Sequence, residues 1–596
     1  MEMPLPLSVL DADIESYREY TRILCTYRNT LAPISKLPTE VMGYIFLLYQ
    51  RGIQGPDVDL YEATSTDHPK RPRDYGMPLE WIKLGHVSYH WRAMALSLTP
   101  LWTHISLKNL QWVDEMISTR SRGCDLVFRD AVDSYEDIES SSTFLAHCLP
   151  RLREIDLAVF HTLRYVFHPE TVLDATAAPH LSCLRLACTP APNDATDHDI
   201  LAKLLSRTAV LRVLEIDFPL KWHSPSLSDI THLKVSHGSH IKAPSPSELF
   251  DALSCMEHLQ VLHLVGDALP VRPDEPPKVF SNLERQRPYL PAMLTLILNG
   301  SIDSLYFFLE NVDIPQTAQI RLKSSRCPER ADVPYVSMIV SRIKQMYWPS
   351  RYASQPGFPI HSLDISFSNE DLLSHDALRR LRAHILRLKA WDAAPSTGVQ
   401  ASLMNDPTYA VDNLIDLELP WWPHNTPARS ICQDAPSLLS DICYTLPCKS
   451  LTALSFRVRD DTNITNLFTV SDTFFLDVFG PQTELRSFYT NPPVLQSLLL
   501  NMSPPTTIAA NAIPQRRMTA ESPPTILFPH LRLLHVTNNF RSCLSEQAFC
   551  TGLYARARSH MRLDTLSIPR LLDPDGPYSS VAVLSQQVTN LVQRAR

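Results

Sequence analysis

The sequence predicts an α/β repeat protein, in which an N-terminal helical module precedes an irregular solenoid. Three observations predict this fold class. A short phrase with apolar residues at its first, fourth and sixth positions recurs along most of the chain. Helical stretches lie between several of these phrases, and two strongly apolar segments stand near the N-terminus. Such repeats cannot bury an apolar face alone, so stacked neighbours have to form one continuous core.

The composition is that of a globular protein with a mild excess of acid. Of the 596 residues, 44% are hydrophobic and 20% are charged, and the net charge is −8. This charge argues against a nucleic-acid surface spread over the whole chain. Glycine is scarce, with 14 residues against 49 prolines. Nucleotide enzymes are therefore disfavoured, because phosphate-cradling loops use clustered glycines.

Cysteine usage and apolar stretches bear on the compartment. The 12 cysteines show no framework spacing and no secretory signal is evident, so we expect reduced thiols in a cytoplasmic or nuclear protein. The longest uncharged stretch, near residues 487–514, contains Pro, Asn and Thr and does not suit a membrane span. We expect neither a membrane nor a nucleic acid among the partners.

An N-terminal segment, residues 1–32, has the apolar spacing of a helix over residues 8–31. Such a helix either packs on the module that follows or pairs with another helix. We expect packing, because the heptad pattern is too short for a coiled coil. The apolar positions are Leu10, Ile14, Tyr17, Leu24, Tyr27 and Leu31.

Residues 33–50 predict a capped helix with more apolar surface than a lone surface helix carries. Pro38 suits the first helical position, and Glu40 complements the helix dipole in the first turn. Val41, Ile45 and Leu48 form one apolar stripe, and Met42, Phe46 and Tyr49 form the adjoining one. Gly43 disfavours the helix by roughly 1 kcal/mol relative to alanine, so we expect a close contact there.

A second apolar segment, residues 81–107, follows a loop at residues 51–79 that is rich in Pro and Gly. Leu84, Val87, Trp91, Met94 and Leu98 mark an amphipathic helix. A basic cluster within the loop, residues 70–73, is either a nuclear-import signal or a solvated loop, and the loop is favoured.

Together these segments resemble the F-box, the helical module that docks on the Skp-type adaptor of cullin–RING ubiquitin ligases. The chain departs from the family pattern at Tyr89 and His90, where a Cys/Ser–Arg/Lys pair is common, and in the length of the loop. The resemblance implies an F-box-like module at residues 33–107, split by the loop at 51–79. The adaptor-binding residues that it implies are Pro33, Ile34, Leu37, Pro38, Val41, Ile45, Phe46, Leu84, Val87, Trp91, Leu101 and Trp102.

From residue 108 to residue 578 the recurring phrase, with helices between its copies, resembles leucine-rich repeats. Early copies begin at intervals of about 30 residues, and later gaps are wider. The asparagine that usually closes the family's phrase is mostly missing, so we expect an irregular array. Pro- and charge-rich insertions interrupt it at residues 266–290, 323–335 and 503–526. Apolar residues at helical spacing over residues 579–596 predict a C-terminal capping helix. An ordinary α/β domain with Leu-rich strands is the alternative.

Catalytic and metal-binding constellations are absent from the sequence. We find no nucleophile elbow, P-loop, HExxH helix or zinc-type cysteine spacing. His232, His237 and His240 lie close together but lack a further ligand of fixed geometry. The acidic run from Asp133 to Glu139 lacks the spacing of a calcium loop. We therefore expect no enzyme activity, no cofactor and no bound metal.

The residues between the Leu positions of each phrase are candidates for binding a target protein. Their mixed charges suit a protein surface better than a phosphate backbone. Trp421 and Trp422 follow one phrase and either form an interface hot spot or fold over a repeat end as core, which is favoured. The candidate residues are Asp156, Arg185, Glu215, Lys234, His263, Asp364, Glu418, Trp421 and Trp422.

These features favour a substrate-recruiting subunit of a Skp–cullin–F-box ubiquitin ligase. Its module would bind the Skp-type adaptor of the cullin complex, and its array would hold an unknown protein substrate near the conjugating enzyme. The alternative is a protein-interaction scaffold outside any ligase, in which the F-box-like helices only cap the solenoid.

Overall fold

The computed structural model divides the chain into two compact units, Met1–His232 and Leu233–Arg596. Each unit is considered by itself. The structure describes residues 7–53, 80–106, 113, 115–132, 134–159, 163–167, 177–188, 195–223, 225–237, 243–271, 287–324, 333–347, 360–373, 380–391, 414–423, 442, 445–446, 450–458, 484–490, 528–536, 553, 563–569 and 588–594.

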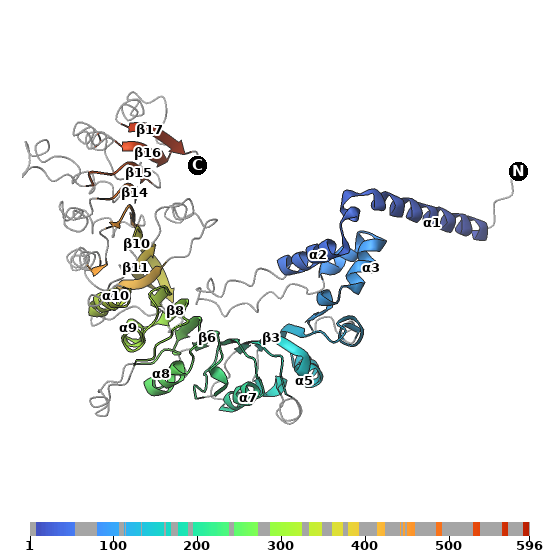
Figure 1. Cartoon of the computed structure of the whole chain (residues 1–596), viewed down its shortest axis with the longest axis horizontal. Helices are drawn as coiled ribbons and strands as arrows, with labels where there is room; N and C mark the ends of the chain where they lie inside the picture. Colours follow the sequence, from blue (N-terminus) through green and yellow to red (C-terminus); the bar gives the residue numbers. More distant parts are fainter. Residues whose placement is uncertain are drawn as a thin grey trace, which may run out of the picture. The chain divides into compact units, whose positions relative to one another are not determined.

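The N-terminal part of the first unit is helical (Figure 1). Ser88 ends the extended backbone before α3 and its side chain accepts a hydrogen bond from the Trp91 amide at 3.1 Å, which caps the helix. Prolines stand in the first turns of η1 and η3, where the missing N–H does no harm. The elements are α1 (Leu7–Leu31), η1 (Pro33–Lys36), α2 (Thr39–Ile53), η2 (Glu80–His86), α3 (Tyr89–Ser97) and η3 (Thr99–Trp102).

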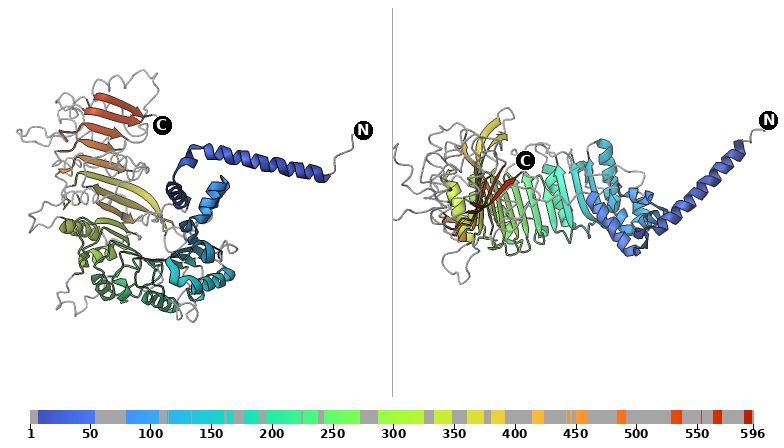
Figure 2. Two further views of the ribbon diagram at one scale, coloured as in Figure 1. Left: turned by 45° about the vertical axis from the view of Figure 1, so that its right-hand side comes forward. Right: turned by 90° about the horizontal axis from the view of Figure 1, so that it is seen from above.

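Helix α1 does not pack on the helices that follow. None of its residues is buried, and Figure 2 shows it extending away from α2 and α3. Its apolar positions, from Leu7 to Leu31, are exposed along the whole helix. The expected packing of residues 8–31 onto the module is therefore wrong for this chain alone. The apolar spacing identified the helix but did not identify what covers it.

Five parallel strands of the first unit follow the helices. Strands β1 to β5 pair in sequence order, with Ile155, Leu184 and Leu214 at matching positions of β3, β4 and β5. Strand β6 lies at the boundary of the two units. The elements are β1 (His104–Ile105), a π-helical turn η5 (Met116–Arg120), β2 (Leu126–Val132), α5 (Tyr135–Cys148), η6 (Leu149–Arg151), β3 (Leu152–Val159), α6 (Leu163–Val166), β4 (Cys183–Cys188), α7 (Ala195–Ser206), β5 (Val213–Ile216), η8 (Pro225–Leu227) and β6 (His232–His237).

Helices cover the apolar face of these strands. The rings of Phe128 on β2 and Phe144 on α5 lie 4.5 Å apart between their centroids. A capping box starts α5, since Ser134 and Asp137 satisfy each other's backbone amides. The leucines and isoleucines of the recurring phrase, such as Ile155 and Leu184, are fully buried. Alternation along each strand therefore leaves the charged residues on the opposite face.

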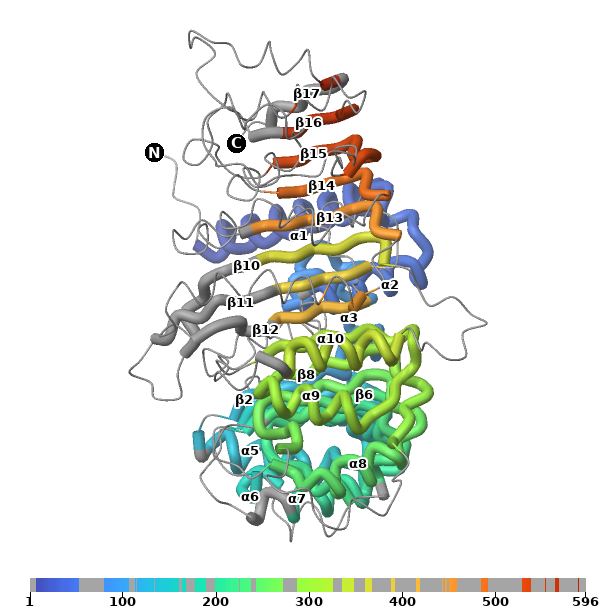
Figure 3. The backbone as a smooth tube through the Cα atoms, turned by 90° about the vertical axis from the view of Figure 1, so that its left-hand side faces the viewer, coloured from blue at the N-terminus to red at the C-terminus, as the bar shows by residue number. Residues whose placement is uncertain are grey.

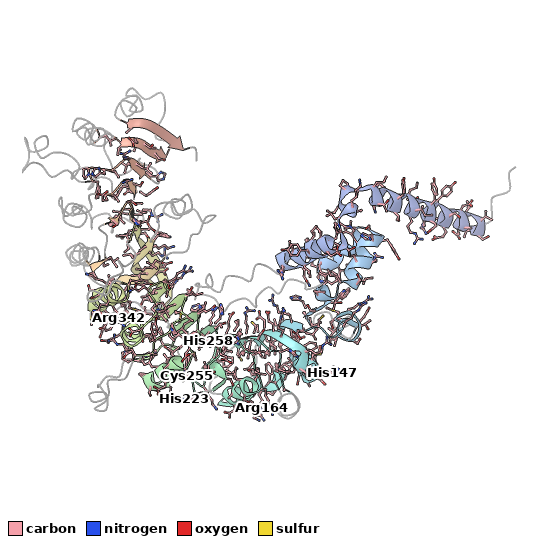
Figure 4. All side chains as sticks on the ribbon, in the orientation of Figure 1. His147, Arg164, His223, Cys255, His258 and Arg342 are labelled. Atoms are coloured by element: carbon pink, nitrogen blue, oxygen red, sulfur yellow. The ribbon has the colours of Figure 1, made fainter. Side chains whose placement is uncertain are left out.

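The second unit continues the alternation of strands and helices before it becomes mainly β. Arg342, labelled in Figure 4, ties α10 to the end of α9, because its guanidinium donates to the carbonyl oxygens of Leu309 at 2.8 Å and Val312 at 3.2 Å. The elements are α8 (Pro246–Ser254), β7 (Val261–Gly266), β8 (Thr295–Gly300), α9 (Ile302–Asn311), β9 (Gln319–Ser324), α10 (Val333–Tyr347), β10 (Ser362–Leu373), β11 (Arg380–Trp391), β12 (Ile415–Pro423), β13 (Ala453–Val458), β14 (Ser487–Thr490), β15 (Leu533–Val536), β16 (Leu563–Pro569) and β17 (Val588–Arg594).

An antiparallel meander interrupts the parallel order of the second unit. Strands β10, β11 and β12 pair antiparallel with one another. Strand β12 pairs parallel with β9, and β10 pairs parallel with β13, so the chain order is reversed at this point (Figure 3). All other strand pairs described in this unit are parallel. The expected α/β repeat with an N-terminal helical module is confirmed in its coarser part: the chain is mixed α/β, with a long, mostly parallel sheet and an N-terminal helical region.

The C-terminal segment differs from its expectation. The capping helix predicted over residues 579–596 is wrong for residues 588–594, which form strand β17 parallel to β16. Val588 and Val592 are β-branched, and the free edge of β16 offers backbone hydrogen-bond partners, which favours a strand over an isolated helix. The expected insertion at residues 503–526 and most of the loop at 51–79 lie outside the described residues.

Candidate functional site

The two halves of the split module pack against each other around aromatic side chains. The rings of Phe46 and Trp91 lie 5.1 Å apart, and those of Trp81 and Trp102 lie 4.8 Å apart in an edge-to-face arrangement. Gln50, which is buried, donates from Nε2 to the carbonyl oxygen of Leu101 at 3.0 Å. The region after the loop therefore returns to α2 and completes one helical body.

The hydrogen bonds inside this body explain why its tryptophans can be buried. Trp102 is 4% exposed, and its Nε1 donates to the carbonyl oxygen of Ala95 at 2.9 Å. The guanidinium of Arg120 stands 5.5 Å from the ring centroid of Trp102, on the strand side of the module. Trp102 thus links the helices to the part of the chain that leads into β2.

The twelve residues expected to bind an adaptor divide into three groups. Leu101 and Phe46 are fully buried and Trp102 nearly so, and the expectation that these three contact a partner is wrong. They are internal because the two halves of the module need an apolar core of their own. The second group is half-buried and comprises Ile45, Leu84 and Trp91. The third group is exposed and comprises Pro33, Ile34, Leu37, Pro38, Val41 and Val87.

Two of the exposed members, Leu37 and Val41, and the half-buried Ile45 belong to a longer apolar row, which we call the docking row: Leu37, Val41, Tyr44, Ile45 and Leu48. Val41 is 43% exposed, Tyr44 60% and Leu48 45%. Steps of three and four residues place the members from α2 on one face of that helix. Tyr44 was not expected at the sequence level, although its spacing from Val41 and Leu48 carries the signal. A row of this kind costs free energy in water and is favourable to cover with a partner.

Gly43 lies beside this row without a close contact. A Cβ added there would stand 3.6 Å from Leu98 Cδ1, which is an ordinary van der Waals distance. The expectation that Gly43 permits an unusually close approach is therefore wrong.

The charged residues expected to bind a target lie instead in cross-strand ion pairs. In the first unit Glu154 Oε1 accepts from Arg129 Nη2 at 2.7 Å and from Arg185 Nη1 at 2.7 Å. Arg185 Nε also donates to Glu215 at 2.6 Å. Glu154 and Arg129 were not among the expected residues, although they stand at neighbouring face positions of β3 and β2. Four strands are thereby joined along the polar face of the sheet.

The second unit repeats this arrangement. Arg457 Nη2 donates to both carboxylate oxygens of Asp364, at 2.8 Å and 2.7 Å. Glu418 accepts from Lys323 at 3.0 Å and from Arg387 at 3.3 Å. Such pairs help to fix the register of the strands, because like charges would otherwise face one another. Arg185, Glu215, Asp364 and Glu418 therefore serve the sheet itself.

The remaining expected target-binding residues are less informative. Asp156 and His263 are buried, and Lys234 is half-buried on β6. Trp421 and Trp422 belong to β12, where the backbone of Trp422 faces His384 of β11. The side chains of the two tryptophans lie outside the described residues. No expected residue is thus established as a target contact.

The described residues also bear on metal binding, thiol reactivity and membrane insertion. Within the described residues no three His, Cys, Asp or Glu side chains gather at a potential metal site. Burial raises the pKa of the Cys183 thiol to about 12, which keeps it protonated and unreactive at neutral pH. No helix in the described ranges has the length and apolar character needed to span a membrane.

Comparison with known proteins adds no family to this picture. No protein-family model matches the chain. No curated protein matches it either.

Proposed function

We propose that the chain is a substrate-recruiting subunit of a Skp–cullin–F-box-type ubiquitin ligase. The residues after the module would form an irregular leucine-rich-repeat-like array that carries the target. The protein would then make and break no bonds itself, and would act in the cytoplasm or nucleus by raising the local concentration of a target lysine.

The observation that carries the proposal is the division of apolar residues between the inside and the outside of the module. Phe46, Leu101 and Trp102 already supply an internal core. Leu37, Val41, Tyr44 and Leu48 remain exposed on one row and are not needed for that core. An apolar row that serves no internal contact is what a helical partner would cover.

The exposed row is also rigidly presented. Helix α2 runs from Thr39 to Ile53, and its buried face is held by Phe46 and by the hydrogen bond from Gln50. A partner would therefore bind without first ordering the backbone of this helix, which reduces the entropic cost of association.

Capture of a purified Skp-type adaptor by the full chain tests the proposal. Wild type should retain the adaptor, and Val41→Asp/Leu48→Asp should lose it, because two charges would be placed in the contact. Both positions are exposed, so the variant should fold normally. Tyr165→Asp/Val210→Asp is the matched control, since these residues are exposed in the same unit outside the module. Failure of wild type to retain the adaptor would refute the proposal.

A scaffold outside any ligase is the second candidate. The contact of Arg120 with Trp102 favours it, because this contact fastens the helical module to the strands as a cap would be fastened. A helical module that only caps the strands would not need an exposed apolar row. The same capture experiment separates the two candidates: the scaffold predicts no adaptor binding by wild type.

A further inference from the structure

A cavity of about 910 Å³ opens in the first unit, where the last turn of α2 faces the start of the sheet. Its walls come from α2, from η3 and β1, from the turn before β2, and from the polar face of β2, β3 and β4. The charged residues of its lining are Arg51, Asp125, Arg129, Arg153, Glu154 and Arg185. We call this cavity the arginine pocket.

The pocket is positively charged although the chain is negative overall. Four arginines, Arg51, Arg129, Arg153 and Arg185, line it against two carboxylates. One of these, Glu154, accepts hydrogen bonds from both Arg129 and Arg185 and is neutralised by them. The net charge of the whole chain is −8, so the pocket is a local exception.

Two of the arginines are available to a ligand. Arg51 at the end of α2 and Arg153 at the start of β3 are exposed and have no ion-pair partner among the residues that the structure describes. They stand on different elements that both line the pocket. The paired residues Arg129, Glu154 and Arg185 line the same pocket.

The side chain of His104 reports the field inside the pocket. Burial lowers its pKa to about 4; the charges of Arg129, Arg153 and Arg51 act in the same direction, and the charge of Glu154 acts against them. Arginines from three separate elements thus act on one imidazole ring, which is neutral at pH 7. The same field attracts an anion.

The size and lining of the pocket decide which anion fits. Pockets of about 300–1,000 Å³ hold ligands much larger than a single phosphate or carboxylate. Among the described residues of the lining there is no Trp, Tyr or Phe, so these residues offer a nucleic-acid base no stacking platform. The wall at Gly123 is open, since nothing lies within 4 Å of a Cβ added there. An extended peptide with anionic side chains satisfies these conditions.

We propose that the arginine pocket binds an acidic segment of a partner polypeptide, with Arg51 and Arg153 pairing its anionic side chains. The anionic groups are carboxylates or phosphates, which arginine binds in the same bidentate manner. As a site for a ubiquitin-ligase target the pocket rests on the proposed function. As a site for an acidic peptide it is independent of the adaptor.

Fluorescence anisotropy with the full chain tests the proposal. The probes are three labelled peptides of equal length, rich in Glu, in phosphoserine and in Gln. The Glu or the phosphoserine peptide should bind, and the Gln peptide should bind at least about tenfold more weakly. Whichever acidic peptide binds more tightly identifies the anionic group. Equal binding of all three, or binding of none, would overturn the proposal.

Variants connect the binding to the pocket. Arg51→Glu/Arg153→Glu should weaken acidic-peptide binding by at least about tenfold, and Arg207→Glu, the control on the same unit, should leave it unchanged. Arg51→Gln/Arg153→Gln provides the same test without charge reversal. Unchanged affinity in both double variants, or tighter binding of an oligothymidylate than of either acidic peptide, would contradict the assignment.

The adaptor experiment keeps this proposal separate from the proposed function. Arg153→Glu alone should weaken acidic-peptide binding and should still be captured by the adaptor, because Arg153 lies on β3, outside the module. Acidic-peptide binding without adaptor binding would leave the pocket in place and refute only the ligase.

Discussion

The rings of Phe46 and Trp91 lie 5.1 Å apart, tilted by 53°, although the loop at residues 51–79 separates them in the sequence. Phe46 comes from α2 and Trp91 from α3. Their contact makes one body of two segments, and it leaves the neighbouring residues Val41 and Leu48 on the outside. One face of α2 thus contributes to the core of the module, and another face of the same helix carries most of the docking row.

Removing Phe46 should destabilise the module, whereas trimming the docking row should not. Phe46→Ala deletes a fully buried ring and should cost about 3–5 kcal/mol of unfolding free energy, because a cavity remains. Val41→Ala removes a side chain that is 43% exposed and should cost much less. Urea unfolding followed by tryptophan fluorescence measures both. Equal losses would show that the row belongs to the core.

Replacing Gly43 should stabilise α2. Alanine lowers the conformational entropy of the unfolded chain and favours the helix by up to about 1 kcal/mol. The added methyl would lie at an ordinary distance from Leu98. The midpoint of thermal unfolding should therefore rise in Gly43→Ala, with adaptor capture as the control for the neighbouring row. A lower midpoint would mean that α2 and Leu98 pack more tightly than this distance indicates.

The half-buried imidazole of His104, desolvated by its surroundings and close to several arginines, should make stability depend on pH. Its pKa in the folded chain is about 4, below the ordinary value of 6.5. The unfolded chain therefore takes up a proton between pH 6.5 and 4 while the folded chain does not, so stability falls as the pH falls through this window. The loss should be on the order of 2–3 kcal/mol at pH 4.

His104→Asn should reduce that loss, because asparagine does not titrate. The measurement is the difference in urea midpoint between pH 7 and pH 4.5, taken for wild type and for the variant. The other histidines contribute to both proteins and cancel in the comparison. An identical pH dependence in the two proteins would contradict a lowered pKa of His104 in the folded chain.

Arg185 should be important for the sheet of the first unit. It joins Glu154 and Glu215, whose side chains are 13% and 7% exposed. Arg185→Met keeps much of the side-chain volume but leaves two partly buried carboxylates close to each other, which should cost about 2–4 kcal/mol. Arg185→Met/Glu215→Gln should recover part of this loss. If the single variant is as stable as wild type, the cross-strand ion pairs of Arg185 contribute nothing to the stability of the fold.

The parallel strands were predictable because the pattern of apolar residues that identifies each strand lies within a few consecutive residues. Leu152, Ile155 and Leu157 keep the spacing of a strand with one covered face, and the same spacing returns in later copies. The β10–β12 meander was not predictable in this way. Ile360, Leu363 and Ile365 show the same phrase as the parallel copies, although β10 pairs antiparallel with β11. Strand direction depends on the connection between strands, and the phrase does not contain it.

The candidate site was predictable as a segment but not residue by residue. Ile45 and Phe46 are adjacent apolar residues, yet one is half-buried and the other is fully buried. Their difference arises from Trp91, which approaches α2 from another part of the chain. The same holds for the charged residues. The alternation of Arg185 with leucines predicts that it lies on the polar face of its strand, but it does not predict whether Arg185 binds a target or Glu154 on the neighbouring strand.

Isothermal titration of the purified full chain with a purified Skp-type adaptor tests the central claim most directly. The account predicts saturable one-to-one binding by wild type, loss of the heat signal in Val41→Asp/Leu48→Asp, and unchanged binding in Tyr165→Asp/Val210→Asp. Absence of binding by the folded wild-type chain, or equal affinity of the docking-row variant, would contradict it.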